Sequence, residues 1–175
     1  MRIATFNILH GRSLQDGRVD VDRLAAAVKS LDADVLGLQE VDRDQPRSLG
    51  ADLTAVAAEA MGAVDSQFVA ALSGTPGGTW MAATGDEQPG SASYGVALLS
   101  RFPVVSWRVV RLPPLRVSGL QPLAPATTPT FPLDEPTRQL DHVLARGPIA
   151  ASGPAEALRL SLSDHRALVV PCAPA

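Results

Sequence analysis

The stretch that decides the fold is LSDHRALVV, residues 162–170. Asp164 and His165 stand side by side directly before an apolar run that continues to Pro171. A short, continuously apolar run is typical of a strand that is buried on both faces. A carboxylate and an imidazole at the entrance of such a strand form a candidate catalytic edge. The question for the rest of the chain is which residues meet this pair.

The overall composition is that of one ordinary globular domain. The chain has 175 residues, of which 46% are apolar and 19% are charged, so we expect residues 1–175 to form a single α/β domain with a sizeable core. The net charge of −3 provides no basic field that would hold nucleic acid non-specifically. Cys172 is the only cysteine, which excludes an internal disulfide and fits a reducing compartment.

Neither a secretory signal nor a membrane span is predicted. Residues 1–9 alternate like a strand and lack both a long apolar segment and a small-residue cleavage site. No apolar run approaches the length of a membrane-spanning helix. We therefore expect a cytoplasmic protein.

The first strand is predicted at residues 3–9, and it contains one polar misfit. Alternation places Asn7 on the same side as Ile3, Thr5 and Leu9. A buried amide needs partners for its oxygen and its NH2 group. Asn7 is therefore either a structural asparagine bonded to a neighbouring loop, or an oxygen ligand or phosphate contact at the strand end.

A second acidic candidate follows the next strand. The spacing of apolar residues predicts a helix up to residue 31, with Asp20 or Asp22 near its N-terminus, and then a buried strand at residues 35–38. This strand ends at Gln39-Glu40. Open α/β sheets usually place their sites at the carboxyl ends of strands, although Glu40 could equally be a solvated loop acid.

The middle of the chain gives weaker signals. Residues 41–50 are highly charged and predict an exposed loop, and residues 52–61 predict a helix that stops at Gly62. Strands are expected at 67–72, briefly at 79–82 and at 94–103, and the segment 104–112 is expected to be the hairpin partner of the last of these.

The region from residue 113 to residue 136 breaks this pattern. It contains seven of the fifteen prolines and predicts no strand or helix beyond a short turn. The pattern resumes at residues 139–145, which predict a strand with Asp141 on one side. An Asp directly followed by a His is common in sequences and is usually structural. A buried carboxylate needs a cation or several donors, so Asp141 on an apolar strand is a stronger candidate for a functional residue.

Five blocks of sequence occur in a recognisable order. They are ATFNI (4–8), VLGLQEV (35–41), YGVALLSRFP (94–103), QLDHVL (139–144) and LSDH (162–165). Together they resemble the endonuclease/exonuclease/phosphatase family, metal-dependent phosphoesterases that include DNA-repair nucleases, sphingomyelinases and inositol phosphatases. Each block alone is weakly specific, but five in order over most of the chain are a strong resemblance.

The resemblance implies a four-layer α/β/β/α sandwich with an active site along one edge of its two facing sheets. It implies that Asn7 and Glu40 help to hold Mg2+, with Mn2+ as an alternative, and that Asp164 lies near the metal or in the proton-transfer network. Oxygen donors of this kind suit Mg2+, which keeps several of its waters.

The resemblance also implies contacts with the substrate, a phosphate ester of nucleic acid, of a lipid head group or of a small molecule. His165 would contact the scissile phosphate and be oriented by Asp141. An imidazole paired with a carboxylate is a useful donor to a phosphate oxygen near neutral pH. Asn7 and Tyr94 would lie near the phosphate.

Two motifs of the family are missing. They are an Asn/Thr-His strand motif and a Gly-Asp-x-Asn motif, whose aspartate activates the attacking water. The break is expected near Leu115-Arg116, which would leave the sandwich incomplete in its central strands. Gly85-Asp86 resembles the second motif in lettering, but it precedes the Tyr94 strand and lies in a polar loop.

This gap leaves several alternatives open. Unpaired strand edges and an uncovered apolar face predict a rearranged compact remnant, a homo-oligomer in which another copy completes the core, or a poorly folded product. The function is either Mg2+-dependent hydrolysis of a phosphate ester or, in a degenerate member, metal or phosphate binding without turnover. A serine hydrolase using Ser93 or Ser163 is rejected because no nucleophile elbow is present.

Overall fold

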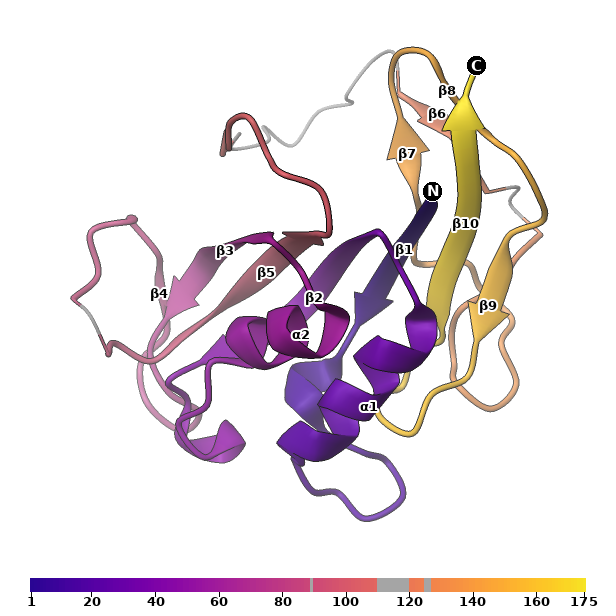
Figure 1. Cartoon of the computed structure of the whole chain (residues 1–175). Coiled ribbons are helices and arrows are strands. Elements are labelled where there is room, and N and C mark those ends of the chain that lie inside the picture. The colour runs from indigo at the N-terminus through magenta and orange to yellow at the C-terminus, as the bar shows by residue number, and fades with distance from the viewer. Residues whose placement is uncertain (89, 110–119, 125–126) are drawn as a thin grey trace.

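The computed structural model describes residues 1–88, 90–109, 120–124 and 127–175 (Figure 1). Its main feature is an eight-stranded mixed sheet with the order β4-β3-β5-β2-β1-β10-β8, in which β9 also pairs with β10. The strands are β1 (Arg2–Asn7), β2 (Val35–Arg43), β3 (Asp65–Ser73), β4 (Met81–Ala82), β5 (Ser93–Ser100), β8 (Ile149–Ala151), β9 (Glu156–Leu158) and β10 (Ala167–Pro174).

Two α-helices cover one face of this sheet (Figure 1). Helix α1 (Val21–Leu31) begins after Asp20, whose side chain accepts hydrogen bonds from two backbone N–H groups of the first turn. Helix α2 (Leu53–Met61) ends at Gly62, which takes a left-handed conformation with φ of 69°. The sequence prediction of both helices is confirmed. It included the aspartate before α1 and the glycine after α2. Short 3-10 turns, η1 (Leu9–Gly11) and η2 (Pro46–Ser48), flank the sheet edge.

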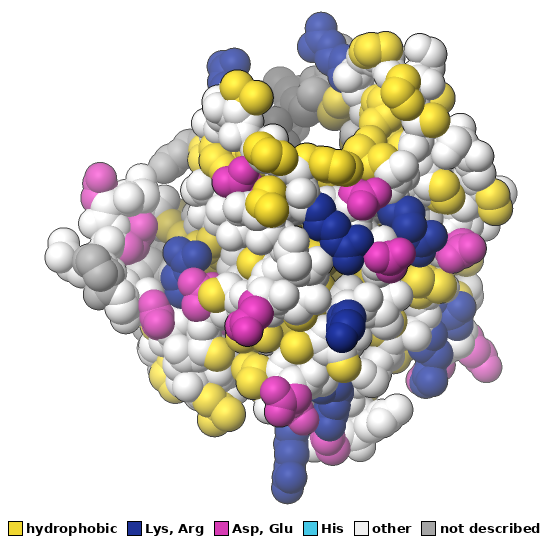
Figure 2. Space-filling view, viewed as in Figure 1, with side chains coloured by type: hydrophobic (Ala, Val, Ile, Leu, Met, Phe, Trp, Pro, Cys, Tyr) yellow, Lys and Arg dark blue, Asp and Glu magenta, His cyan; other side chains and the backbone are white. Residues whose placement is uncertain are grey.

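The main core lies between the helices and the sheet. Fully buried side chains meet there from both layers, among them Phe6, Leu38 and Leu99 from the strands and Leu24 and Leu53 from the helices. Each such side chain contributes about 1.5–3 kcal/mol on burial. Basic and acidic side chains are interspersed over the helical face (Figure 2), which agrees with the small net charge.

A second, smaller layer covers part of the other face. Strands β6 (Gln121–Pro122) and β7 (Leu144–Ala145) form a two-stranded sheet. The neighbouring Ala124 and Val143 pack against Leu168 and Val170 of β10. The α/β class is confirmed, and within the described residues the second sheet is reduced to this pair.

The reduced layer leaves apolar side chains of β5 exposed. Val96 is 47% exposed and Leu98 is 43% exposed, whereas their neighbours Ala97 and Leu99, which point toward the helices, are buried. Strand β5 thus has one covered face and one open face.

Two local predictions were wrong or only partly right, and a third is not tested. Residues 104–109 form no strand, since both edges of β5 are already paired with β2 and β3 and the Val104 N–H donates to the Asp65 carboxylate (2.7 Å). Residues 110–119, including the expected Leu115-Arg116 break, lie outside the described part of the chain. Only Leu144–Ala145 of the predicted 139–145 strand is a strand.

The charged segment 41–50 is also not the exposed loop that was expected. Strand β2 continues to Arg43, and Asp42, Gln45 and Ser48 are fully buried. For the described residues, no helix has both the length and the apolar character that a membrane crossing requires.

Candidate active site

The topology brings the predicted site residues to one edge of the large sheet. Strands β1 and β2 are parallel and their pairing ends at Asn7 and Gln39, so Glu40 lies beside the end of β1 although β2 continues to Arg43. Strands β5 and β10 run antiparallel to them, so Tyr94 and the segment before β10 lie where these strands begin. Four segments far apart in the sequence therefore share one edge.

Glu40 is directed toward Asn7 by an irregularity in β2. The pairing of β2 with β5 shifts register between Leu38 and Val41, and Glu40 takes the left-handed conformation with φ of 58°. Such a conformation costs about 1 kcal/mol or more for a residue with a side chain, and it is often found at functional sites. The Asn7 amide Nδ2 donates to Glu40 Oε1 at 3.0 Å, and its Oδ1 accepts the Leu9 N–H at 3.0 Å.

Tyr94 completes this group from the start of β5. Its hydroxyl hydrogen-bonds the Glu40 carboxylate. Burial, together with the negative charge of Glu40, raises the pKa of Tyr94 above its ordinary value, so the phenol stays protonated and acts as a donor at neutral pH. The ring packs edge-on against Trp80, with ring centroids 6.2 Å apart.

A buried ion pair supports Tyr94 from the other side. Asp42 is fully buried, and its two carboxylate oxygens accept from Arg47 Nε (2.8 Å) and Nη2 (2.7 Å). The Arg47 guanidinium lies 5.3 Å from the Tyr94 ring centroid. Hydrogen bonding to Asp42 raises the pKa of Arg47 further, which fixes a positive charge beside the site.

The imidazole and carboxylate expected to act together do meet. His165 Nδ1 lies 2.8 Å from Asp141 Oδ2, across 24 residues of sequence. Asp141 is 7% exposed, and its N–H donates to Thr130 Oγ1 (3.3 Å), while the Phe131 ring lies 4.9 Å from the His165 ring. Because Nδ1 faces Asp141, Nε2 is the nitrogen available to a substrate.

Ser163 joins this pair to the end of β1. Its Oγ donates to the Asn7 carbonyl oxygen at 2.6 Å and accepts the His165 N–H at 3.1 Å. Ser163 is fully buried and has φ of 72°. The backbone before β10 is thereby fixed relative to Asn7, and the His165 ring is positioned on the same edge as Glu40.

Asp164 lies between these groups in sequence but is the least constrained of them. Its side chain is half-buried and makes no hydrogen bond or ion pair with any residue in the described ranges. No bond links it to Glu40, and no three His, Cys, Asp or Glu side chains of the described chain lie close enough together to hold a metal ion.

The donor set nevertheless suits Mg2+ in its chemistry. Glu40 supplies a carboxylate whose orientation is held by Asn7 and Tyr94. Asn7 Oδ1 accepts one hydrogen bond and retains a second lone pair, and Asp164 adds an unengaged carboxylate. Mg2+ is commonly bound through one or two carboxylates with several waters retained, so these residues fit this ion.

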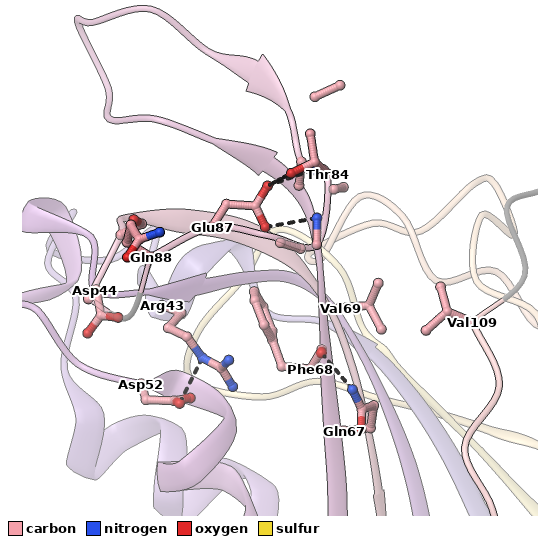
Figure 3. A pocket seen from close by; sticks show the side chains of 17 residues that line it. Arg43, Asp44, Asp52, Gln67, Phe68, Val69, Thr84, Glu87, Gln88 and Val109 are labelled. Atoms are coloured by element: carbon pink, nitrogen blue, oxygen red, sulfur yellow. Dashed lines mark hydrogen bonds and ion pairs between the residues drawn. The ribbon is translucent and has the colours of Figure 1, made fainter.

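A wide pocket lies elsewhere on the molecule (Figure 3). It has a volume of about 1030 Å³ and is lined mainly by β3, β4 and the loop after β4, with the Arg43–Asp52 ion pair (2.9 Å) at one side. None of the predicted site residues lines it. Asp86, in the adjoining loop, is exposed and does not replace the missing aspartate of the family motif.

The sequence reading missed the supporting residues. Asp42 and Arg47 were assigned to an exposed loop, although an acid and a base five residues apart after an apolar strand are a recognisable signal. Ser163 was weighed only as a nucleophile. Thr130 lies in the proline-rich region and gave no signal, since its partner Asp141 is distant in sequence.

The fold is a mixed α/β sheet with helices on one face, and this edge gathers carboxylate, amide, phenol and imidazole groups from separate segments. The family model of the endonuclease/exonuclease/phosphatase family matches residues 4–118. The chain belongs to this family, whose members hydrolyse phosphate esters. The match covers the blocks around Asn7, Glu40 and Tyr94, and the residues that contain Asp141 and His165 lie beyond it.

Two solved structures share the fold. One is an endonuclease/exonuclease/phosphatase from Beutenbergia cavernae DSM 12333, with a TM-score of 0.71 and 19% identity over 99% of this chain and 71% of that one. The other is an endonuclease/exonuclease/phosphatase family protein from Leptotrichia buccalis C-1013-b, with a TM-score of 0.59 and 14% identity over 97% of this chain and 98% of that one. No curated protein matches the chain.

Proposed function

We propose that this chain hydrolyses a phosphate ester with the help of Mg2+, using the edge formed by Asn7, Glu40, Tyr94, Asp141 and His165. The observation that carries the proposal is the 2.8 Å contact between His165 and the buried Asp141, held beside Asn7 by Ser163. These residues come from separate parts of the chain, and their convergence supports a common role.

Each residue has a distinct role in this proposal. Asp141 accepts from His165 Nδ1 and orients the ring, so that Nε2 faces a phosphoryl oxygen of the substrate. Tyr94 and Asn7 hold the Glu40 carboxylate as the principal ligand of the ion. Bound Mg2+ would offset the negative charge that grows on the phosphoryl oxygens. Mn2+ would serve the same role.

The residue that would activate the attacking water, Asp164, is the least firmly positioned of the proposed site. In the proposed reaction the water oxygen bonds to phosphorus, the ester P–O bond breaks, and the departing alkoxide takes up a proton. We assign the proton of the attacking water to Asp164, whose half-buried carboxylate has no other partner among the described residues. One unanchored carboxylate is a poor substitute for an oriented one, so turnover should be slow.

The alternative is a degenerate family member that binds metal or phosphate without turnover. It is favoured by the lack of any cluster of three acidic, His or Cys ligands in the described parts of the chain, and by the missing aspartate motif. The first reading and the metal-binding form of the second predict metal binding at Glu40, and only the first predicts hydrolysis.

The test is hydrolysis of bis(p-nitrophenyl) phosphate with Mg2+, with EDTA, and with two histidine variants. We expect slow, EDTA-sensitive turnover that His165→Ala lowers by about a hundredfold or more, since a positioned acid or base contributes about 10²–10⁴-fold. The control is His142→Ala, because His142 is an exposed histidine one residue from Asp141. Turnover that survives His165→Ala would refute the assignment, and no turnover with intact metal binding would favour the degenerate reading.

Three further features belong to this proposal. The substrate is a phosphate ester from nucleic acid, a lipid head group or a small molecule. A cytoplasmic setting is supported by the single, free and buried Cys172. A second copy of the chain covering the open face of β5 remains a prediction, supported by the exposure of Val96 and Leu98.

A further inference from the structure

A basic pocket adjoins the candidate active site. It has a volume of about 660 Å³, and its lining includes the side chains of His10, Arg12, Arg18 and Arg47. No Asp or Glu is among the lining residues. On a chain whose net charge is −3, three arginines around one cavity are a local concentration of positive charge.

The loop that carries two of these arginines is held in a defined shape. Arg12 and Val19 form an antiparallel bridge, and the Ser13 N–H donates to the Arg18 carbonyl at 3.0 Å. Gly17, with φ of 68°, donates its N–H to the Ser13 carbonyl at 2.9 Å, and an ideal Cβ at Gly17 would lie 3.5 Å from Arg12 Nη2. The loop therefore closes on itself and holds the Arg12 guanidinium against its backbone.

An ion pair ties this loop to helix α1. The Arg23 guanidinium donates to both carboxylate oxygens of Asp16, at 3.1 and 2.7 Å. The hydrogen bond from Arg23 lowers the pKa of Asp16 well below its ordinary value. The Asp16 carboxylate is thus paired with the Arg23 guanidinium, and it forms no ion pair with the Arg12 or Arg18 side chain within the described residues.

The positive charge in the pocket is only partly compensated. Arg12 and Arg18 are exposed, and neither guanidinium makes an ion pair or hydrogen bond within the described residues. Arg47 uses Nε and Nη2 for Asp42, which leaves Nη1. Like charges gathered around one cavity repel each other, and a bound anion would relieve this repulsion.

The pocket lies next to the catalytic edge. His10 is in η1, directly after β1, and both Glu40 and Asp42 are close enough to act on its pKa. Arg47 lies between the pocket and Tyr94, whose ring its guanidinium faces. An anion in the pocket would therefore sit beside the phosphoryl group at Glu40 and His165 without occupying its place.

We propose that this pocket binds a second phosphate group of the substrate. The inference rests on the proposed function in one respect, namely that the scissile phosphate lies at His165. The planar fork of arginine matches phosphate oxygens and makes charge-assisted hydrogen bonds to them. The second phosphate belongs either to a small bisphosphate or to the neighbouring nucleotide of a nucleic-acid strand. Kinetic measurements with one substrate of each kind distinguish these two sources.

Binding is tested first without metal or turnover. Inorganic phosphate is titrated into the 15N-labelled protein in EDTA at low salt, and amide shifts are followed by NMR. We expect shifts in residues 11–19 and an affinity lowered about tenfold or more in the double variant Arg12→Gln/Arg18→Gln, because charged hydrogen bonds are lost. Arg146→Gln, which changes an exposed arginine without an ion pair in the described chain, is the control.

A second measurement links the pocket to the substrate. The double variant should raise KM about tenfold for a substrate with two phosphates, either a 5′-phosphorylated dinucleotide or a small bisphosphate, and leave KM for bis(p-nitrophenyl) phosphate unchanged. The substrate that shows the effect identifies the source. A double variant that changes KM equally for all substrates, or for none, would overturn the proposal. Phosphate-induced amide shifts confined to residues outside 11–19 would also overturn it.

The two proposals fail separately. A protein that binds phosphate at residues 11–19 and hydrolyses nothing would refute the proposed hydrolysis while retaining the anion pocket. A protein that hydrolyses the single-phosphate ester, and whose double variant lacking Arg12 and Arg18 binds phosphate equally well, would refute the anion pocket and retain the proposed hydrolysis.

Discussion

Replacing Arg47 by methionine should destabilise the protein more than replacing Asp42 by asparagine, although both changes break the same ion pair. The Asp42 side chain is fully buried, whereas the Arg47 side chain is 29% exposed. The methionine variant leaves a carboxylate without its cation and without access to water. The asparagine variant leaves a guanidinium that can turn toward solvent.

These differences set the magnitudes. Removing one partner of a buried pair costs about 3–5 kcal/mol, and we expect Arg47→Met to fall in this range. For Asp42→Asn we expect about 1–3 kcal/mol, because the amide NH2 cannot accept one of the two Arg47 hydrogen bonds while the guanidinium stays partly hydrated. Arg159→Met serves as the control, since the Arg159–Asp134 pair is exposed on both sides (53% and 72%) and should contribute less than about 1 kcal/mol.

The Arg47→Met variant should also acquire a pH dependence. Without Arg47, the buried Asp42 carboxylate has no cation, so its protonation relieves the cost of burying the charge. The folded variant then binds more protons than its unfolded state, so its stability is highest at acidic pH and falls as the pH rises. The double variant Asp42→Asn/Arg47→Met has no such carboxyl and should lack this slope.

Urea unfolding followed by circular dichroism at pH 4, 5.5 and 7 measures these free energies. Equal costs of less than about 1 kcal/mol for both single variants would show that the pair is not buried in solution. The same pH profile for Arg47→Met and the double variant would refute the assignment of the slope to Asp42.

Three further predictions concern the site and the core. Asp141→Asn should lower kcat of phosphodiester hydrolysis about tenfold or more, since a charge-assisted hydrogen bond to His165 is weakened; an unchanged kcat would remove Asp141 from the site. Glu40→Gln should weaken Mg2+ binding about tenfold or more in calorimetric titrations, whereas Glu59→Gln, on the exposed face of α2, should leave it unchanged. Leu99→Ala should cost about 2–5 kcal/mol in urea unfolding, and Leu98→Ala less than about 1 kcal/mol, because Leu98 is 43% exposed; a large cost at Leu98 that grows with protein concentration would show that a second copy covers this face.

The candidate site could be predicted in part because its residues end or begin strongly patterned strands. Asn7 and Glu40 follow apolar runs, and His165 precedes one. Local periodicity located these strands but not their ends, since β1 stops at Asn7 and β2 continues to Arg43. The parallel pairing of β1 with β2 places Asn7 beside Glu40. The order of the family's blocks supplied the expectation that Asp141 would meet His165.

The supporting residues could not be predicted in this way. Asp42 carries a charge and follows a bulge, so its local sequence favours an exposed loop, and it is buried only because Arg47 returns through η2 to pair with it. The hairpin partner of β5 was wrongly predicted because sequence alternation does not reveal that both edges of a strand are already occupied.

The sequence by itself determined the family, the α/β class, the two helices with their aspartate caps, and the existence of the strands in or beside which Asn7, Glu40 and His165 lie. Those features depend on apolar spacing and capping, which act within a few residues. Only the tertiary structure decided that Asp42 would be buried, that Ser163 would join His165 to Asn7, and that Arg12, Arg18 and Arg47 would surround one cavity. These contacts join segments far apart in the chain, and their free energy exists only once the sheet order has brought the segments together.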